Sequence, residues 1–131
     1  MLYEKGLQLE TTLQDGIFVH GCGAQLQQAA GVYLDNAQKY AAPGTAVRVT
    51  LARCGHHRAR LAVATQGEAI PQNELQNIFK RFYRIDPAHH RDGSYGLGLA
   101  IAAGVAEQYG GKVWAESENG VNTFYLELKT V

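Results

Sequence analysis

The segment GSYGLGLAI, from Gly93 to Ile101, is the most informative part of this sequence. Its glycines at 93, 96 and 98 precede or enter an apolar segment that predicts a helix. Glycine lets backbone N–H groups approach an anion without interference from a Cβ, and the first turn of a helix adds unpaired donors and the positive end of its dipole. Because tight turns and ordinary helix starts also use glycine, the interpretation as a phosphate site depends on the rest of the chain.

Length and composition predict a single globular domain. The 131 residues are 46% apolar, and twelve basic side chains balance twelve acidic ones. Such a chain can bury a core, and its zero net charge gives no electrostatic basis for binding nucleic acid or a membrane surface. No apolar run approaches the roughly 20 residues that cross a bilayer, and the charged start MLYEKGLQLE is unlike a signal peptide. We expect a cytoplasmic domain without a nucleic-acid partner, monomeric when isolated.

The two cysteines, Cys22 and Cys54, suit a reduced protein, although the sequence leaves a disulfide between them open. Cys54 opens the segment CGHH, which lies between two strand-like runs and has no second ligand pair at zinc-finger spacing. This spacing favours a polar hairpin turn over a metal site. The pair His89–His90 is assigned to a polar loop on the same reasoning.

Hydrophobic periodicity predicts helices and hairpins in alternation. The expected elements are a strand over Leu7–Leu13, a helix over Ala24–Tyr40, a hairpin of Thr45–Ala52 and Arg58–Ala64, a short helix over Gln72–Phe82, a helix over Gly96–Tyr109, and a hairpin of Lys112–Ser117 and Asn122–Leu128. Hairpins in place of regular βαβ units indicate an α+β fold. We expect a two-layer sandwich in which a mixed, mostly antiparallel sheet is covered on one face by about three helices.

Each long helix carries an apolar stripe that predicts its buried face. The stripe of the first is Leu26, Ala30, Tyr33, Ala37 and Tyr40, and that of the second is Leu97, Ile101 and Val105.

Asn36 lies at the edge of the first stripe, with Lys39 three residues later. An amide is a poor choice for a helix interior unless it has a partner, because it competes with the backbone for hydrogen bonds. Its carbonyl oxygen is a suitable ligand for Mg²⁺, which usually shares such ligands with substrate phosphates. The helix alone leaves a second interpretation open, in which Asn36 and Lys39 belong to a solvated polar face.

Four motifs occur in a fixed order along the chain: LDNAQKY (34–40), TQGEAIP (65–71), IFKRFYR (78–84) and GSYGLGLAI (93–101). In this order, the chain from about Leu7 to Leu128 resembles the ATP-binding catalytic domain of sensor histidine kinases, with the Bergerat or GHKL fold shared with gyrase, Hsp90 and MutL. The first and third motifs look like the N box and the F box of that family. The second and fourth look like its two glycine boxes, and the ATP lid is expected at about 84–95.

The resemblance implies a binding site for ATP and Mg²⁺. Asn36 is expected to hold the Mg²⁺, and the amides around Gly96 and Gly98 are expected to face the phosphates. Phe79 and Phe82 are expected to pack at the base of the lid. The full set of residues expected at the nucleotide is Asn36, Lys39, Tyr40, Thr65, Gly67, Ala69, Ile70, Tyr95, Gly96, Leu97, Gly98, Leu99 and Thr123.

The first glycine box departs from the family's usual Asp-x-Gly-x-Gly. Thr65 stands where the family has the aspartate that accepts the adenine amino group, and Ala69 stands at the second glycine. Val32 replaces a second asparagine that many members carry. A neutral side chain accepts a hydrogen bond more weakly than a charged one, and the difference costs on the order of tenfold in ATP affinity. An alternative is therefore a degenerate module with weak or no ATP binding that acts by protein contacts; an anti-sigma factor-like branch of the family fits the motifs less well.

The resemblance also implies partners. None of the five histidines stands in a His-Glu-x-x-x-Pro helix like that of the family's dimerisation domain. We therefore expect a single domain over 1–131, excised from a longer, membrane-anchored parent kinase. It would donate the γ-phosphoryl group of ATP to a histidine on the parent's dimerisation domain and act indirectly on a response regulator. It is not competent as a kinase alone.

Overall fold

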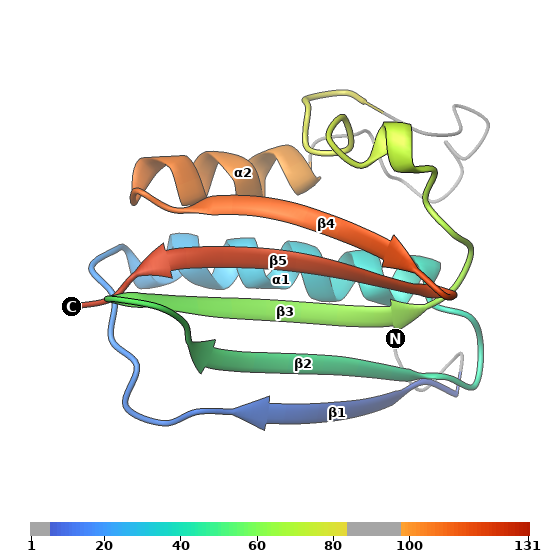
Figure 1. Cartoon of the computed structure of the whole chain (residues 1–131), viewed down its shortest axis with the longest axis horizontal. Coiled ribbons are helices and arrows are strands. Elements are labelled where there is room, and N and C mark those ends of the chain that lie inside the picture. The colour runs from blue at the N-terminus through green and yellow to red at the C-terminus, as the bar shows by residue number, and fades with distance from the viewer. Residues whose placement is uncertain (1–5, 84–97) are drawn as a thin grey trace.

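The computed structural model describes residues 6–83 and 98–131 (Figure 1). Its elements are β1 (Gln8–Leu13), α1 (Gly23–Tyr40), β2 (Ala46–Arg53), β3 (Arg58–Gln66), η2 (Gln72–Glu74), α2 (Gly98–Gln108), β4 (Lys112–Glu118) and β5 (Val121–Lys129). The strand order is β1-β2-β3-β5-β4, with β1 parallel to β2 and every other neighbouring pair antiparallel. The predicted α+β fold with a mixed, mostly antiparallel sheet is confirmed.

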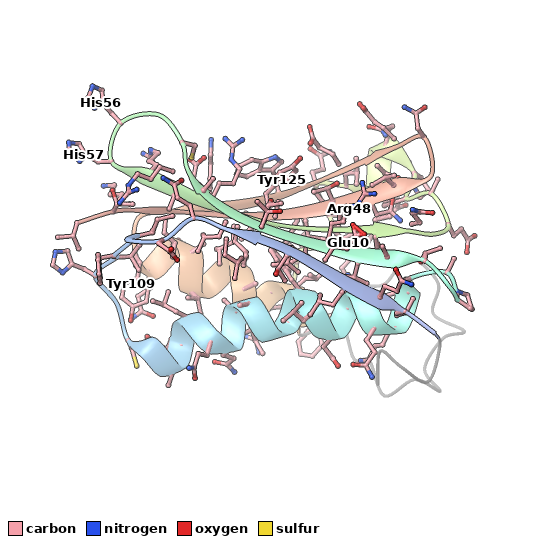
Figure 2. All side chains as sticks on the ribbon, turned by 90° about the horizontal axis from the view of Figure 1, so that it is seen from below. Glu10, Arg48, His56, His57, Tyr109 and Tyr125 are labelled. Atoms are coloured by element: carbon pink, nitrogen blue, oxygen red, sulfur yellow. The ribbon has the colours of Figure 1, made fainter. Side chains whose placement is uncertain are left out.

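Both long helices lie on the same face of the sheet, as Figure 2 shows in a view from below. The strands alternate accordingly: on β5, Phe124, Leu126 and Leu128 face the helices and are buried. The other face is open, and its surface includes an ion pair between Glu10 and Arg48 at 3.3 Å (Figure 2).

The core lies between α1, α2 and the middle of the sheet. Tyr33 of α1 is fully buried with its ring centroid 5.7 Å from that of Phe124, and its hydroxyl donates a 2.6 Å hydrogen bond to the Tyr125 carbonyl. Burial raises the pKa of Tyr33 far above its usual value, so the hydroxyl stays protonated. On the helix side, Ala102 and Ala106 are buried on α2, and their small size allows close packing.

The two predicted hairpins are confirmed. Asn119 and Gly120 turn the chain between β4 and β5 with φ of 52° and 77°, the left-handed backbone that an Asn-Gly turn favours. Residues 54–57 turn the chain between β2 and β3, with the Cys54 N–H donating to the Arg58 carbonyl at 2.9 Å. Both cysteines are free, and the described residues contain no group of three or more His, Cys, Asp or Glu side chains that would suit a metal ion. None of the helices in these residues has the length and hydrophobicity that a membrane span requires.

The helix predicted over Gln72–Phe82 is wrong. Only the short 3₁₀ helix η2 forms there, followed by hydrogen-bonded turns up to Phe82. The side-chain amide of Asn77 donates to the Asn73 carbonyl, the acceptor that the Asn77 N–H would use in an α-helix, and that N–H bonds to Glu74 instead. This competition by a local side chain is the reason that asparagine disfavours helix interiors. The described part of the sheet is therefore covered by two α-helices and a turn segment.

Two residues predicted on buried helix faces are exposed. Tyr40 is 47% exposed, because the buried row of α1 runs through Ala29, Tyr33, Ala37 and then Ala41. Ile101 is 38% exposed, because α2 buries Ala102, Val105 and Ala106. At Tyr40 and at Ile101 the buried row of the helix therefore lies one residue away from the predicted stripe. Val105 is buried as predicted, and Leu97 lies outside the described residues.

Candidate functional site

The candidate site is built around the point where β3 leaves the sheet. Thr65 is the last helix-facing residue of β3 and is only 4% exposed. Beyond Gln66 the chain turns away, and Gly67 meets the end of α1 so closely that a Cβ on it would lie 2.8 Å from the Tyr40 carbonyl oxygen. A hydrogen bond of 2.7 Å from the Ala42 N–H to the Gln66 carbonyl joins the same two segments. Glycine is therefore required at 67 by packing against α1.

The last two turns of α1 carry three of the predicted residues. Asn36 and Lys39 are half-buried, whereas Tyr40 is exposed. The Lys39 ammonium lies 3.5 Å from the Asp35 carboxylate one turn earlier, an i,i+4 ion pair at the solvent edge of the helix. The positive charge of Lys39 is thus held on the part of α1 that adjoins the end of β3.

The start of α2 lies against the same part of α1. A Cβ on Gly98 would lie 3.5 Å from Cγ1 of Val32, which is one turn before Asn36. Leu99 is partly buried and packs against the core, together with Val32. Val32, which the resemblance marked as a departure, therefore contributes apolar contact between the helices.

The structure brings three of the predicted groups to one end of the helix-covered face. These are Asn36, Lys39 and Tyr40 on α1, the segment from Thr65 to Ile70, and Gly98 and Leu99 on α2. Tyr95, Gly96 and Leu97 lie outside the described residues, as do the expected lid at 84–95 and the pair His89–His90.

Thr123 is not brought to this group. It pairs with Ala64, one position away from the Thr65–Asn122 pair, so it lies on the open face. The residue beside Thr65 on the helix-covered face is Asn122, which is 6% exposed. The alternation of β5, counted back from the buried Phe124, was a sequence signal that could have identified Asn122.

Ala69 occupies its position without strain. It is exposed, and it is not among the non-glycine residues with positive φ in the described chain. The two glycine positions of the box therefore differ: at 67 a side chain meets the backbone of α1, whereas at 69 a methyl group is accommodated. Of the predicted lid-base residues, Phe79 packs against the core, but Phe82 is 65% exposed with the Arg81 guanidinium 5.4 Å from its ring centroid.

A second polar cluster lies on the open face, away from this site. Glu127 is nearly fully buried, and its carboxylate accepts hydrogen bonds from Arg60 at 3.0 Å and from the Cys54 thiol at 3.4 Å. The Lys112 ammonium forms an ion pair with the same carboxylate at 3.9 Å. Burial by itself raises the pKa of Glu127, but these hydrogen bonds and the nearby positive charges outweigh it and the pKa is lowered. Burial, and then the bond to Glu127, raises the pKa of Cys54.

Comparisons with known proteins agree on one family. The family model described as histidine kinase-, DNA gyrase B-, and HSP90-like ATPase matches residues 21–131. The signal transduction histidine-protein kinase/phosphatase MprB of Mycolicibacterium smegmatis is 43% identical over 93 residues, which are 71% of this chain and 19% of that protein. This chain thus spans less than a fifth of the length of that relative.

Solved structures agree as well. The mycobacterial sensor histidine kinase MprB superposes with a TM-score of 0.85 at 28% identity, covering 98% of this chain and 86% of the other. Full-length ShkA in complex with AMPPNP gives a TM-score of 0.84 at 24% identity, over 98% of this chain and 27% of the other, a likeness that concerns the fold.

Proposed function

Because the chain belongs to the family of histidine kinase-, DNA gyrase B-, and HSP90-like ATPases, we propose that residues 1–131 form the ATP-binding catalytic domain of a sensor histidine kinase. The observation that carries this proposal is the meeting of α1, the segment after β3 and the start of α2 at one end of the helix-covered face. Three elements from distant parts of the sequence converge there, and each contributes a motif of the family.

In the proposed pocket, the nucleotide lies between these three elements. Thr65 accepts one hydrogen bond from the base, and the backbone of Gly67, Ala69 and Ile70 lines the base pocket. Lys39 supplies positive charge at the phosphates and Tyr40 covers the edge of the site. The segment around Gly98 and Leu99 presents backbone N–H groups at the start of a helix, where an anion is stabilised.

Asn36 is the proposed ligand of Mg²⁺. The described residues offer no cluster of three acidic, histidine or cysteine side chains. An amide oxygen that acts with the nucleotide's own phosphates and water suits Mg²⁺, which keeps several waters and is rarely held by protein groups alone. Metal binding in this proposal therefore depends on the nucleotide, and Asn36 alone would not retain the ion.

The proposed reaction is transfer of the γ-phosphoryl group of ATP to a histidine on a separate dimerisation domain of the same parent, with a response regulator as the later acceptor. The relative MprB is a histidine-protein kinase/phosphatase, which supports this choice of acceptor. In such transfers the protein supplies position and charge, so this domain would orient the triphosphate for an acceptor that another domain provides. We place it in the cytoplasm, where ATP is available, with the parent anchored in the membrane. A module acting only through protein contacts has no support in the comparisons.

Isothermal titration of the purified domain with ATP, with and without Mg²⁺, tests the proposal. We expect saturable heat with a dissociation constant in the micromolar range that weakens when Mg²⁺ is removed. Cooperative thermal unfolding measured on the same sample shows that the protein is folded. No heat at millimolar ATP from a cooperatively folded sample would refute the proposed function.

A further inference from the structure

Three polar residues lie side by side on the helix-covered face, at the end of the sheet next to the proposed pocket. Thr65 of β3 pairs with Asn122 of β5, and Asn122 pairs with Ser117 of β4. They are 4%, 6% and 6% exposed, although the other buried residues of the face that they share are apolar. Buried polar groups require partners, so the bonds that these residues form indicate their role.

Ser117 and Asn122 direct their bonds at the segment after β3. The Ser117 hydroxyl donates to the Asn122 side-chain carbonyl at 2.5 Å and accepts from the Ile70 N–H at 3.0 Å. The Asn122 amide donates to the Glu68 carbonyl at 2.9 Å, and the Gln72 side chain donates to the Ser117 carbonyl at 2.9 Å. We call Ser117 and Asn122, with these bonds, the latch.

The segment's other contacts include the packing of Gly67 against the end of α1 and of the Ile70 side chain against the core. The pairing of β3 with β5 ends at Gln66, so residues 67–72 leave the sheet without a strand partner. Apart from the latch, the Gly67 N–H bonds to the Gly120 carbonyl in the β4–β5 turn at 3.1 Å. Figure 1 shows this segment rising from the end of β3 beside that hairpin. The hydrogen bonds that join residues 67–72 to the sheet therefore run to the β4–β5 hairpin.

We propose that Ser117 and Asn122 are positioning residues that hold the segment Gly67–Gln72 in its binding geometry before a nucleotide arrives. This inference rests on the proposed function, because Thr65, Gly67, Ala69 and Ile70 are the residues assigned there to the base. A preformed segment loses little conformational freedom on binding, so the latch raises affinity without touching the ligand. A buried network of neutral groups also selects one arrangement of the backbone, which an apolar contact would not do.

The test compares Ser117→Ala with Tyr33→Phe. Ser117→Ala removes the latch hydroxyl, whereas Tyr33→Phe removes an equally buried hydroxyl whose bond goes to the Tyr125 carbonyl, away from the segment. Two quantities are measured on the whole chain: amide hydrogen exchange at Ile70, and the dissociation constant for Mg²⁺·ATP by titration. We expect Ser117→Ala to speed exchange at Ile70 and to weaken binding, each by about fivefold or more, whereas Tyr33→Phe changes neither.

A second variant separates positioning from general damage. Ser117→Thr keeps the hydroxyl, and we expect it to restore slow exchange at Ile70 and wild-type affinity. Unchanged exchange at Ile70 in Ser117→Ala would overturn the latch, whatever the unaltered chain binds. Faster exchange with unchanged affinity would overturn the positioning role. Lack of binding by the unaltered chain is a different result, because it overturns the proposed function while the exchange data still report on the latch.

Discussion

Replacement of Gly67 by alanine is expected to destabilise the domain, although the same replacement at Gly31 is expected to stabilise it. A Cβ at 67 would lie 2.8 Å from the Tyr40 carbonyl oxygen, well inside the 3.4 Å at which ordinary van der Waals contact begins. The obstacle is backbone, and it is fixed by the bonds from Ala42 to Gln66 and from Gly67 to Gly120. The overlap therefore cannot be relieved by rotation of a side chain.

The magnitude follows from two opposing effects. Overpacking of this kind costs about 1–3 kcal/mol. Replacing glycine with alanine also reduces the freedom of the unfolded chain, which stabilises the folded state by about 0.4–1 kcal/mol. The net loss for Gly67→Ala is about 1–2 kcal/mol, or roughly 4–8 °C in melting temperature for a domain of this size. Gly31 is exposed in the middle of α1, and beyond its chain neighbours and the helix's own backbone no atom lies within 4 Å of its Cβ position. Gly31→Ala should therefore gain about 0.5–1 kcal/mol.

Thermal and urea unfolding of the two variants beside the unaltered chain measures both effects. The pair is matched, because each variant adds one methyl group and removes one glycine from the unfolded chain. A Gly67→Ala variant that is as stable as Gly31→Ala would refute the reasoning, since it would show that the end of α1 and the segment after β3 can separate without loss.

Three further results are expected. Thr65→Asp should raise ATP affinity about tenfold, because a charged acceptor binds more strongly, and should lower the stability of the empty domain, because residue 65 is buried. Adding Ala69→Gly should change the titrated ATP affinity little, because Ala69 is unstrained. No gain in affinity from either change would show that residue 65 does not contact the base. Asn36→Ala should abolish the Mg²⁺-dependent part of binding at nearly unchanged melting temperature, whereas a large drop would make Asn36 structural. Glu127→Gln should cost about 1 kcal/mol at neutral pH, a modest value because its cationic partners contact solvent. Because the folded pKa of Glu127 lies below its ordinary value, this stabilisation is present above about pH 4.5 and is lost as the pH falls through the folded pKa. Urea unfolding from pH 7 to pH 3 measures the difference in unfolding free energy between the unaltered chain and Glu127→Gln, and a constant difference would contradict this expectation.

The fold was predictable where local pattern and tertiary packing agree. Alternation gave the strands β2 to β5, and an Asn-Gly pair at 119–120 marked the last turn, because both signals depend on neighbouring residues alone. The helix expected over Gln72–Phe82 failed for an equally local reason, the side chain of Asn77, which the apolar spacing does not register. The exposure of Ile101 depends instead on which side of α2 meets α1, a long-range fact that spacing by three and four does not fix.

The candidate site divides in the same way. Asn36, Thr65 and Gly67 were identified from motifs, and the structure places them on elements that meet. Ser117 was missed because its importance arises from the register of β4 with β5, which places it beside Asn122. Asn122 was missed although the alternation of β5 carried a signal for it. A motif search weighs each short segment by itself, so it assigned Thr123, one residue away but on the opposite face of the sheet.

The neutral row Thr65–Asn122–Ser117 gives a physical reason for the unusual first glycine box. An aspartate at 65 would be buried beside an amide that already donates to the Glu68 carbonyl and a hydroxyl that already donates to that amide. Its charge would meet neutral neighbours across the sheet, and a buried carboxylate without a cation is costly until a ligand supplies donors. Threonine avoids this cost in the empty domain and, in the proposed pocket, would offer the base a weaker, uncharged acceptor. Stability of the empty site and affinity for the base should therefore change in opposite directions when residue 65 is altered, which distinguishes a pocket tuned to weaker binding from one that has lost its ligand.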